Sequence, residues 1–345
     1  MAREKIISRE ELGPEDERFN SALRPESLDE CIGMDDLLEK LRISITAARQ
    51  RNEPMEHVLL HGPPGLGKTT LAYVIANEMG STIRVSSGPA LTRPSDLIGI
   101  LTNLEASDVL FIDEIHRLSP AVEEYIYPAM EDYKVDFVVD SGMHSRTINL
   151  PLKPFTLIGA TTRSGMLSPP LRTRFGITHH LEFWTSEDLL KRCTMSAEML
   201  NLKYEPPALS MLADRARGTP RIANRLLRRC RDYAQVKGDG HLTVQSVEAA
   251  LLLEGIDKLG LDELDRNFLR RIIEIYKGGP VGIEAVAATL GEETDTLVDV
   301  VEPFLLQNGL LARTRRGRMV TPKSYKHLGI SDIPPQDSAG LFDEQ

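Results

Sequence analysis

The chain has 345 residues, enough for two or three domains, and its 41% hydrophobic content is sufficient for packed cores. A formal net charge of −10 argues against a globally basic nucleic-acid-binding protein, although it leaves room for local basic patches. No apolar run reaches the roughly eighteen residues of a membrane span, no apolar signal segment opens the chain, and three cysteines without metal-binding spacing favour a reducing cytoplasm.

The N-terminal residues, up to about Arg24, are polar and mixed in charge, and we expect them to be loosely ordered at first. Apolar residues in 37–51 then recur on one side of an amphipathic helix. A short apolar run at 58–60 precedes the glycine-rich segment 62–70, and apolar residues at helical spacing follow it. This order predicts a strand, a loop and a helix whose N-terminus faces the loop.

Segment 62–70 reads GPPGLGKTT and matches the phosphate-binding pattern GxxxxGK[ST]. Glycines such as Gly65 and Gly67 let the backbone turn tightly and aim its N–H groups at phosphate oxygens. Lys68 adds a positive charge, and Thr69 offers a hydroxyl to Mg²⁺. A plain glycine-rich turn is the alternative, but the flanking strand and helix patterns favour a nucleotide site.

Further strands and helices alternate along the next part of the chain. An apolar strand at 109–112 is followed by a helix around 120–130, and 155–159 is another central strand. Alternating strands and helices predict an α/β fold with a parallel sheet.

A hairpin is predicted between these elements, at 133–150. Val135, Phe137 and Val139 alternate with polar residues before a Ser141-Gly142 turn. The alternating apolar residues can form an exposed docking face. The alternative is that this face packs against its own domain.

Two acidic residues, Asp113 and Glu114, close the apolar strand at 109–112. In an open α/β sheet, ligands bind at the carboxyl ends of the strands. Asp113 is therefore expected in the Mg²⁺ shell, and Glu114 is expected to orient or deprotonate the attacking water. Thr161 and Thr162 follow the strand at 155–159, where a hydroxyl can bridge the γ-phosphate and that water.

The chain becomes helical after Trp184. Four helical segments up to about Leu253 predict a small all-α unit, and three further helices followed by a basic hairpin describe a winged helix. We therefore expect a large α/β domain at 1–184, a small helical domain at 185–256, a winged-helix domain at 257–335 and a disordered tail at 336–345.

Arginines supply the remaining candidate residues. Arg174, in the run LRTRFG, has the donor geometry that suits a transferring phosphoryl group, and a surface ion pair is the alternative. Arg221 opens a helix of the all-α unit and can reach the nucleotide. The basic cluster on the wing is expected to bind DNA phosphates without reading bases, and a solvated basic loop is the alternative. Its members are Arg313, Arg315, Arg316, Arg318 and Lys323.

These motifs together resemble the AAA+ ATPases, and within them the RuvB family of Holliday-junction branch-migration motors. The resemblance rests on seven runs that occur in family order along nearly the whole chain. They are LRP at 23–25, HGPPGLGKTT at 61–70, FIDEIHRL at 111–118, FTLIGATTR at 155–163, LRTRFG at 171–176, GTPRIANR at 218–225 and RGR at 316–318.

The resemblance implies a P-loop domain, a lid and a DNA-binding winged-helix head. It implies a homo-hexameric ring around duplex DNA that uses ATP and Mg²⁺, and that works at Holliday junctions with RuvA and with the resolvase RuvC. The hairpin 133–150 matches the element of the family that docks RuvA.

Site roles follow from the same resemblance. Leu23, Arg24 and Trp184 are implied to contact the adenine side, and Gly65, Gly67, Lys68, Thr69 and Thr70 to hold the phosphates. Thr69 and Asp113 are implied as metal ligands, Thr161 as sensor 1, Arg221 as sensor 2, and Arg174 as an arginine finger that acts on the ATP of a neighbouring subunit. Arg313, Arg316 and Arg318 are implied as DNA contacts.

Some positions depart from the pattern of the family. They are Cys31 and Met34, Trp184 in place of a usual tyrosine, and Arg315 in place of a usual proline. An ATP-switched DNA loader or initiator without processive movement is an alternative function, to be separated by ATP turnover per binding event. A protein unfoldase is disfavoured because 86–91 (SSGPAL) lacks the aromatic residue of a pore loop.

Overall fold

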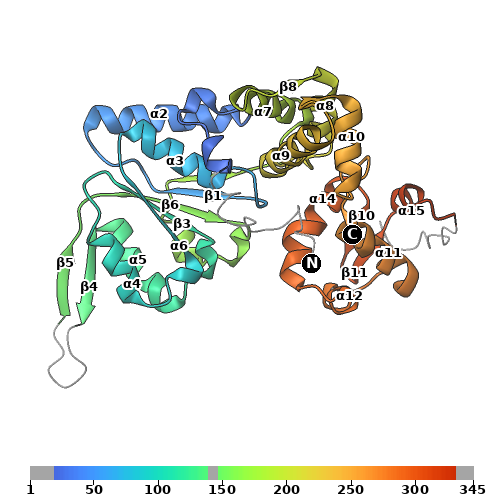
Figure 1. The fold of residues 1–345 in the computed structure, drawn as a ribbon. Helices are drawn as coiled ribbons and strands as arrows, with labels where there is room; N and C mark the ends of the chain where they lie inside the picture. The colour runs from blue at the N-terminus through green and yellow to red at the C-terminus, as the bar shows by residue number, and fades with distance from the viewer. Residues whose placement is uncertain (1–18, 139–146, 332–345) are drawn as a thin grey trace. The chain divides into compact units, whose positions relative to one another are not determined.

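The computed structural model describes residues 19–138 and 147–331 (Figure 1). They divide into two units. The sheet unit runs through Ser196 and also includes Thr219–Arg221; the helical unit comprises Ala197–Gly218 and the residues from Ile222 onward. Loose order was expected up to about Arg24; residues 1–18 of that stretch lie outside the described residues, whereas 19–22 are helical and Leu23 is buried. Val139, the hairpin turn at 141–142 and the tail at 336–345 also lie outside the described residues.

The sheet unit is built on five parallel strands in the order β2-β3-β6-β1-β7. The strands are β1 (Val58–His61), β2 (Ile83–Ser87), β3 (Val109–Asp113), β6 (Thr156–Thr161) and β7 (Ile177–His180). The three central strands are apolar and almost wholly buried, as strands covered on both faces must be. The predicted α/β fold with a parallel sheet is therefore confirmed.

Helices cover both faces of this sheet (Figure 1). One face packs against α2 (Asp35–Arg51) and α3 (Lys68–Met79), and the other against α4 (Pro94–Leu101) and α5 (Pro120–Glu131). Successive strand residues point to opposite faces, so Val58 and Leu60 join the first core and Leu59 joins the second. A short helix, α6 (Pro169–Arg172), follows β6.

A two-stranded antiparallel hairpin follows α5. It pairs β4 (Lys134–Val138) with β5 (Thr147–Pro151). Val135 is fully buried in the core beneath α5, and its cross-strand partner Leu150 packs against the same core. Ile148, two residues from Leu150 and thus on the same face, is 47% exposed. The base of the hairpin face is therefore core, and its outer part is exposed.

The helical unit begins with a lid. Its helices are α8 (Pro206–Asp214), α9 (Pro220–Lys237), whose first two residues belong to the sheet unit, and α10 (Val244–Leu253). The preceding helix α7 (Ser186–Met199) belongs to the sheet unit up to Ser196. A short parallel pair, β8 (Lys203–Tyr204) with β9 (His241–Leu242), joins two of the connections. Thr243 and Ser246 form a capping box that fixes the start of α10.

A winged helix with a core of its own follows. Its elements are α11 (Glu263–Tyr276), α12 (Ile283–Leu290), α13 (Thr294–Thr296), α14 (Glu302–Gln307), β10 (Leu311–Thr314), β11 (Gly317–Val320) and α15 (Pro322–Leu328). The helical stretch from Thr294 to Gln307 is interrupted by a π-helical segment, Leu297–Val301. Pro303 accounts for the break, because it cannot donate the helical hydrogen bond to the carbonyl four residues before it.

A buried ion pair joins the lid to the winged helix. Arg217 Nη1 lies 2.8 Å from Asp265 Oδ2, and the two side chains are 2% and 0% exposed. Arg217 also donates from Nη2 to the carbonyl of Val300, and its guanidinium lies over the ring of Phe304. The lid and the winged helix are therefore fastened to each other within the helical unit.

Among the helices of 19–138 and 147–331, none combines the length and the apolar character that a membrane span requires.

Candidate nucleotide site

The glycine-rich loop runs from the end of β1 into the start of α3. Gly65 and Gly67 have φ angles of 79° and 98°, which side chains rarely tolerate. A Cβ atom on Gly65 would also lie 2.7 Å from Thr219 Cγ2, so the close approach of residues 219–221 requires glycine there. Gly67 is the N-cap of α3, and the free N–H groups of that helix start face the loop.

Lys68 is buried in the curl of this loop, with 7% of its surface exposed. Its Nζ donates to the carbonyl oxygens of Gly62 and Pro63, each at 2.8 Å. The ammonium group is thus held by the loop itself, at the N-terminus of α3. A positive charge and a row of N–H groups in one place form an anion-binding site.

The two acidic residues occupy the carboxyl end of β3, as predicted. Asp113 Oδ1 accepts a hydrogen bond from the Glu114 N–H at 2.9 Å. Burial raises the pKa of Asp113, while that N–H and the charge of Lys68 act in the opposite direction. Because β3 and β1 run parallel on either side of β6, the acid at the end of β3 and the phosphate loop after β1 lie at the same edge of the sheet.

Glu114 has a left-handed backbone, with φ at 50°. A non-glycine residue there costs roughly 1–2 kcal/mol, which the surrounding packing must offset. Gly88, just after β2, supplies part of that packing: a Cβ atom on it would lie 2.4 Å from the Glu114 carbonyl oxygen. The strained turn therefore depends on a close backbone contact from the neighbouring strand.

Thr161 and Thr162 differ in their hydroxyl contacts. Thr161 Oγ1 accepts from the Arg163 N–H at 2.9 Å and lies 2.8 Å from His116 Nδ1. Thr162 Oγ1 is buried, and no partner for it occurs in the described part of the chain. His116 in turn places Nε2 3.5 Å from Glu114 Oε2. His116 lies in the family run at 111–118, but no local pattern predicted its contact with Thr161, because the two residues are 45 positions apart.

Arg221 lies against the phosphate loop. Its N–H donates to the Gly65 carbonyl at 3.4 Å, and its positive charge partly offsets the burial that raises the pKa of Asp113. The structure thus brings Arg221 together with the loop and the acid within the sheet unit.

Three family models match successive parts of the chain. They describe the P-loop domain of the Holliday junction DNA helicase RuvB at 23–181, the RuvB AAA lid domain at 184–257 and the RuvB C-terminal winged helix domain at 258–329. The solved RuvB Holliday junction branch migration motor of Thermotoga maritima is 51% identical, with a TM-score of 0.82, over 89% of this chain and 98% of its own. The chain belongs to the RuvB family.

Two other solved structures are similar to the chain to different degrees. A point mutant of T. maritima RuvB is 52% identical and has a TM-score of 0.83, over 89% of this chain and 98% of its own. The FIGL-1 AAA domain, solved with ADP, is 18% identical with a TM-score of 0.50, over 70% of this chain and 91% of its own, and so supports the fold alone. The RuvB matches confirm the three-part AAA+ architecture and the family resemblance.

The RuvB-family residues expected on the adenine side also lie in the sheet unit. Leu23 is 1% exposed, and its carbonyl accepts from the Arg192 guanidinium. The guanidinium of Arg24 lies 4.1 Å from the ring centroid of Tyr73, on α3. Trp184 packs against the core beneath α2 and α3, and its buried indole N–H has no partner among the described residues. A buried N–H group without a hydrogen-bond partner can donate to a polar atom of a bound ligand.

Arg174, the expected arginine finger, contacts other residues of its own chain. Its Nε lies 3.1 Å from Glu131 Oε1, without hydrogen-bond alignment, and its Nη1 donates to the Pro170 carbonyl at 2.6 Å. The guanidinium also lies 4.5 Å from the centroid of the Tyr127 ring, and the side chain is 21% exposed. The helix α5 therefore holds Arg174 at the edge of the sheet unit.

The wing of this RuvB-family chain holds two kinds of arginine. Arg313, Arg315 and Arg316 are exposed, whereas Arg318 is 11% exposed and forms a double contact with Glu302, at 2.5 and 3.1 Å. Glu302 is itself 2% exposed. The structure thus separates Arg318 from the exposed arginines expected beside it.

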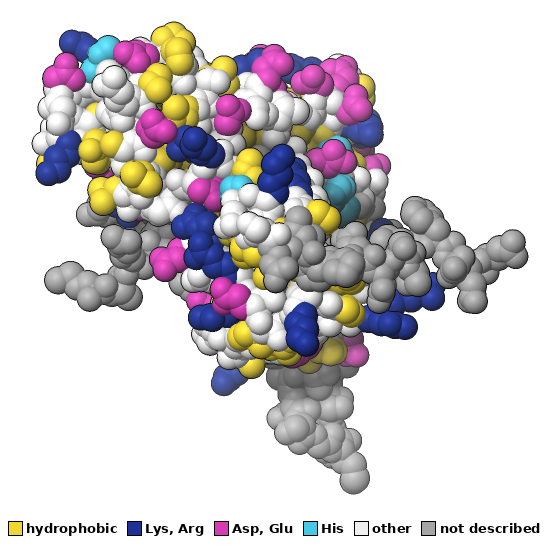
Figure 2. Space-filling view, turned by 90° about the vertical axis from the view of Figure 1, so that its right-hand side faces the viewer, with side chains coloured by type: hydrophobic (Ala, Val, Ile, Leu, Met, Phe, Trp, Pro, Cys, Tyr) yellow, Lys and Arg dark blue, Asp and Glu magenta, His cyan; other side chains and the backbone are white. Residues whose placement is uncertain are grey.

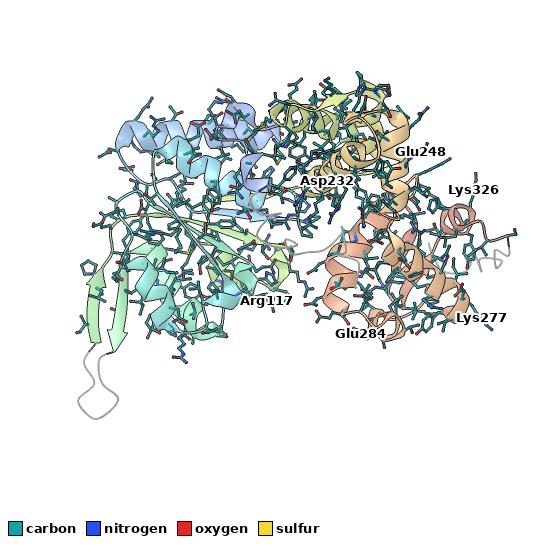
Figure 3. The ribbon with its side chains drawn as sticks, viewed as in Figure 1. Arg117, Asp232, Glu248, Lys277, Glu284 and Lys326 are labelled. Atoms are coloured by element: carbon teal, nitrogen blue, oxygen red, sulfur yellow. The ribbon has the colours of Figure 1, made fainter. Side chains whose placement is uncertain are left out.

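The winged helix also carries exposed lysines. Lys277, at the end of α11, and Lys326, on α15, point outward in Figure 3. Figure 2 shows Lys and Arg side chains interspersed with Asp and Glu on the face that it presents. The net charge of −10 is thus compatible with local basic areas.

Proposed function

We propose that this chain is an ATP-driven motor that moves the branch point of Holliday junctions, and that it acts in the cytoplasm as a homo-hexameric ring on duplex DNA. The observation that carries the proposal is the meeting of the phosphate loop, Asp113-Glu114 and Arg221 in one unit of a RuvB-family chain. The exposed arginines of the winged helix add a DNA-binding surface.

In this proposal ATP binds at the loop. The N–H groups of Gly65, Gly67 and the start of α3 receive the phosphates, together with Lys68, Thr69 and Thr70. Leu23, Arg24 and Trp184 line the adenine side. Thr69 and Asp113 offer the oxygen donors that suit Mg²⁺, which supplies positive charge to the phosphates when bound.

Hydrolysis needs a water placed in line with the γ-phosphate. Glu114 acts as the base that orients and deprotonates that water. The unmet hydroxyl of Thr162 makes it the better candidate to face the γ-phosphate, while Thr161, expected as sensor 1, acts behind it through His116. Arg221 contributes charge from the same subunit, and Arg174 from a neighbouring one.

The remaining surfaces take the partners. The hairpin 133–150 docks RuvA, which brings the ring to the junction where RuvC resolves it. Arg313 and Arg316 bind DNA phosphates, while Arg318 supports the wing by holding Glu302.

Two variants of the phosphate site test this function. Lys68→Ala removes the positive charge at the β- and γ-phosphates, so ATP hydrolysis should be lost. Glu114→Gln should bind ATP with near-wild-type affinity and hydrolyse almost none, because the amide fits but activates water poorly. Near-normal turnover by Lys68→Ala would contradict the site. Stoichiometric use of ATP per DNA-binding event, without sustained turnover, would favour the loader or initiator instead.

A further inference from the structure

We propose that His116 is a positioning residue for ATP hydrolysis, which sets the Glu114 carboxylate according to the position of Thr161. The inference rests on the proposed function, because it concerns the base of that reaction. The three residues involved lie close together in the fold. Glu114 follows the end of β3, Thr161 ends the neighbouring strand β6, and His116 lies in the short turn Ile115–Arg117.

The turn is fastened to β6 next to Thr161. Ile115 is 1% exposed and packs onto Gly159, where a Cβ atom would lie 3.0 Å from Ile115 Cδ1. Gly159 and Thr161 lie two residues apart and therefore on the same face of β6. With Ile115 seated on the glycine, the next residue of the turn, His116, reaches the threonine.

His116 is held between the two functional side chains. Its side chain is 3% exposed, with Nδ1 2.8 Å from Thr161 Oγ1 and Nε2 3.5 Å from Glu114 Oε2. Thr161 Oγ1 already accepts the Arg163 N–H, so its own hydrogen is available to donate to Nδ1. The imidazole therefore spans from a fixed hydroxyl to the catalytic carboxylate.

The contact with Thr161 determines which nitrogen of the His116 ring carries the hydrogen. When Nδ1 accepts from the threonine, a neutral imidazole carries its hydrogen on Nε2. The opposite tautomer would direct a lone pair at the Glu114 carboxylate, which is unfavourable. An N–H thus faces Glu114 and limits the directions in which that carboxylate can point, as partners behind a reactive group commonly do.

Through these contacts the orientation of the Glu114 carboxylate depends on the position of the neighbouring strand, β6. Thr161 is followed directly by Thr162, whose hydroxyl is the candidate to face the γ-phosphate. A shift of the end of β6 would move Thr161 Oγ1, then the imidazole, and then the carboxylate. His116 would in this way couple the position of β6 to the orientation of the Glu114 carboxylate, which acts as the base.

The test compares steady-state ATP hydrolysis and ATP affinity in the full-length wild type, His116→Ala, Thr161→Val and the double variant. We expect His116→Ala to lower kcat about 10- to 100-fold, the range for losing such a partner, with Kd for ATP within about twofold of wild type. The double variant should be no slower than His116→Ala alone, because Thr161 acts through the imidazole.

Two conservative variants keep the test decisive if His116→Ala does not fold. His116→Asn retains a group for Thr161 but cannot reach Glu114, and His116→Gln can reach toward Glu114. Both should lower kcat with KM nearly unchanged. His57→Gln is the matched control: His57 is also buried, with hydrogen bonds to Met130 and Leu157, but does not contact Glu114, so its kcat should be unchanged.

Histidine-selective ¹⁵N labelling gives a readout that does not depend on turnover. The His116 signal should show hydrogen on Nε2, and it should move in both Thr161→Val and Glu114→Gln. A folded His116→Ala with wild-type kcat, or Thr161 and His116 effects that multiply, would overturn the inference while leaving the ATPase intact. Absence of turnover in the wild type would instead contradict the proposed function.

Discussion

Single side chains in the sheet unit act by joining segments that are distant in sequence. His57 is 8% exposed, its Nδ1 accepts from the Leu157 N–H, and its Nε2 donates to the Met130 carbonyl. The ring therefore connects the start of β1 to β6 and α5 in its neutral form. Burial accordingly lowers the pKa of His57 below the ordinary value of 6.5.

This contact makes the stability of the sheet unit depend on pH. Since the folded pKa of His57 is lowered, its contribution is fully present above about pH 6.5 and is lost as the pH falls below it, when the unfolded chain takes up a proton first. The free energy of unfolding of the wild type should fall by up to about 1.4 kcal/mol per pH unit from this residue.

The measurement is urea unfolding of the wild type and His57→Gln at several pH values between 7 and 5. Glutamine does not titrate, so the variant should show a shallower decline. His61 and His179, whose pKa values burial also lowers, remain in both proteins and set the common background. Equal slopes in the two proteins would exclude His57 as a source of the pH dependence.

In the wing, formed by β10 and β11, neighbouring arginines differ in their exposure and contacts. Arg313 and Arg316 are exposed and available to phosphates, while Arg318 neutralises the buried Glu302. Replacing Arg313 and Arg316 together by alanine should weaken binding to all DNA sequences alike. It should also reduce the slope of log K against log salt by about 2 per bound wing, at roughly 0.9 per contact.

Arg318→Ala should behave differently from that pair. It leaves Glu302 buried without its partner, so we expect a loss of about 3–5 kcal/mol in the stability of the winged helix. Salt-dependent DNA binding and thermal unfolding of the two variants separate the roles. An Arg313/Arg316 variant with wild-type DNA affinity and slope would show that these arginines are only a solvated loop.

The hairpin β4–β5 has a buried base and an exposed outer part. Ile148→Asp should weaken RuvA binding while the basal ATPase persists, because an exposed apolar residue is lost from the docking face and the core is untouched. Val135→Asp is the control, because a charge in the core should lower the melting temperature and the ATPase together. Unchanged RuvA affinity in Ile148→Asp would exclude this face as the docking site.

The spacing of apolar residues in the sequence predicted those helices and strands that have one or both faces apolar. The helix α2 and the strands β1, β3 and β6 were all expected, because one or both of their faces are apolar. The strand β7, with the sequence ITHH, has no such alternation, and β2 lies at the sheet edge with exposed residues. The short helices α4 and α15 were likewise not predicted, since neither is long enough for a clear period.

For the candidate site, sequence patterns located the phosphate loop and Asp113-Glu114, because each motif is contiguous. They did not show which side chains meet across the fold. The pairing of His116 with Thr161 and that of Arg318 with Glu302 depend on packing between segments 45 and 16 residues apart. Such contacts set the roles of individual residues, and no local period encodes them.

At the scale of the whole molecule, the proposed ring requires each subunit to complete the ATP site of its neighbour. Arg174 is expected to do so, although within its own subunit it contacts Glu131, Pro170 and Tyr127. Arg174→Ala should bind ATP normally and hydrolyse it about 10³- to 10⁵-fold more slowly.

Mixing two inactive variants tests whether Arg174 acts between subunits. Lys68→Ala subunits retain Arg174, and Arg174→Ala subunits retain an intact phosphate loop, so mixed rings should recover part of the ATPase. The mixture should be compared with each variant alone, after mass measurement has shown that mixed rings form. Mixed rings without any recovery would place the action of Arg174 within its own subunit.

The most direct test of the central claim is branch migration of a synthetic four-way junction, measured with the wild type or Glu114→Gln in the presence of RuvA and ATP. We predict that the wild type converts the junction to duplex products while hydrolysing ATP, and that Glu114→Gln binds the junction but leaves it in place. Conversion at the spontaneous rate by an actively hydrolysing wild type, or equal conversion by Glu114→Gln, would contradict an ATP-driven motor.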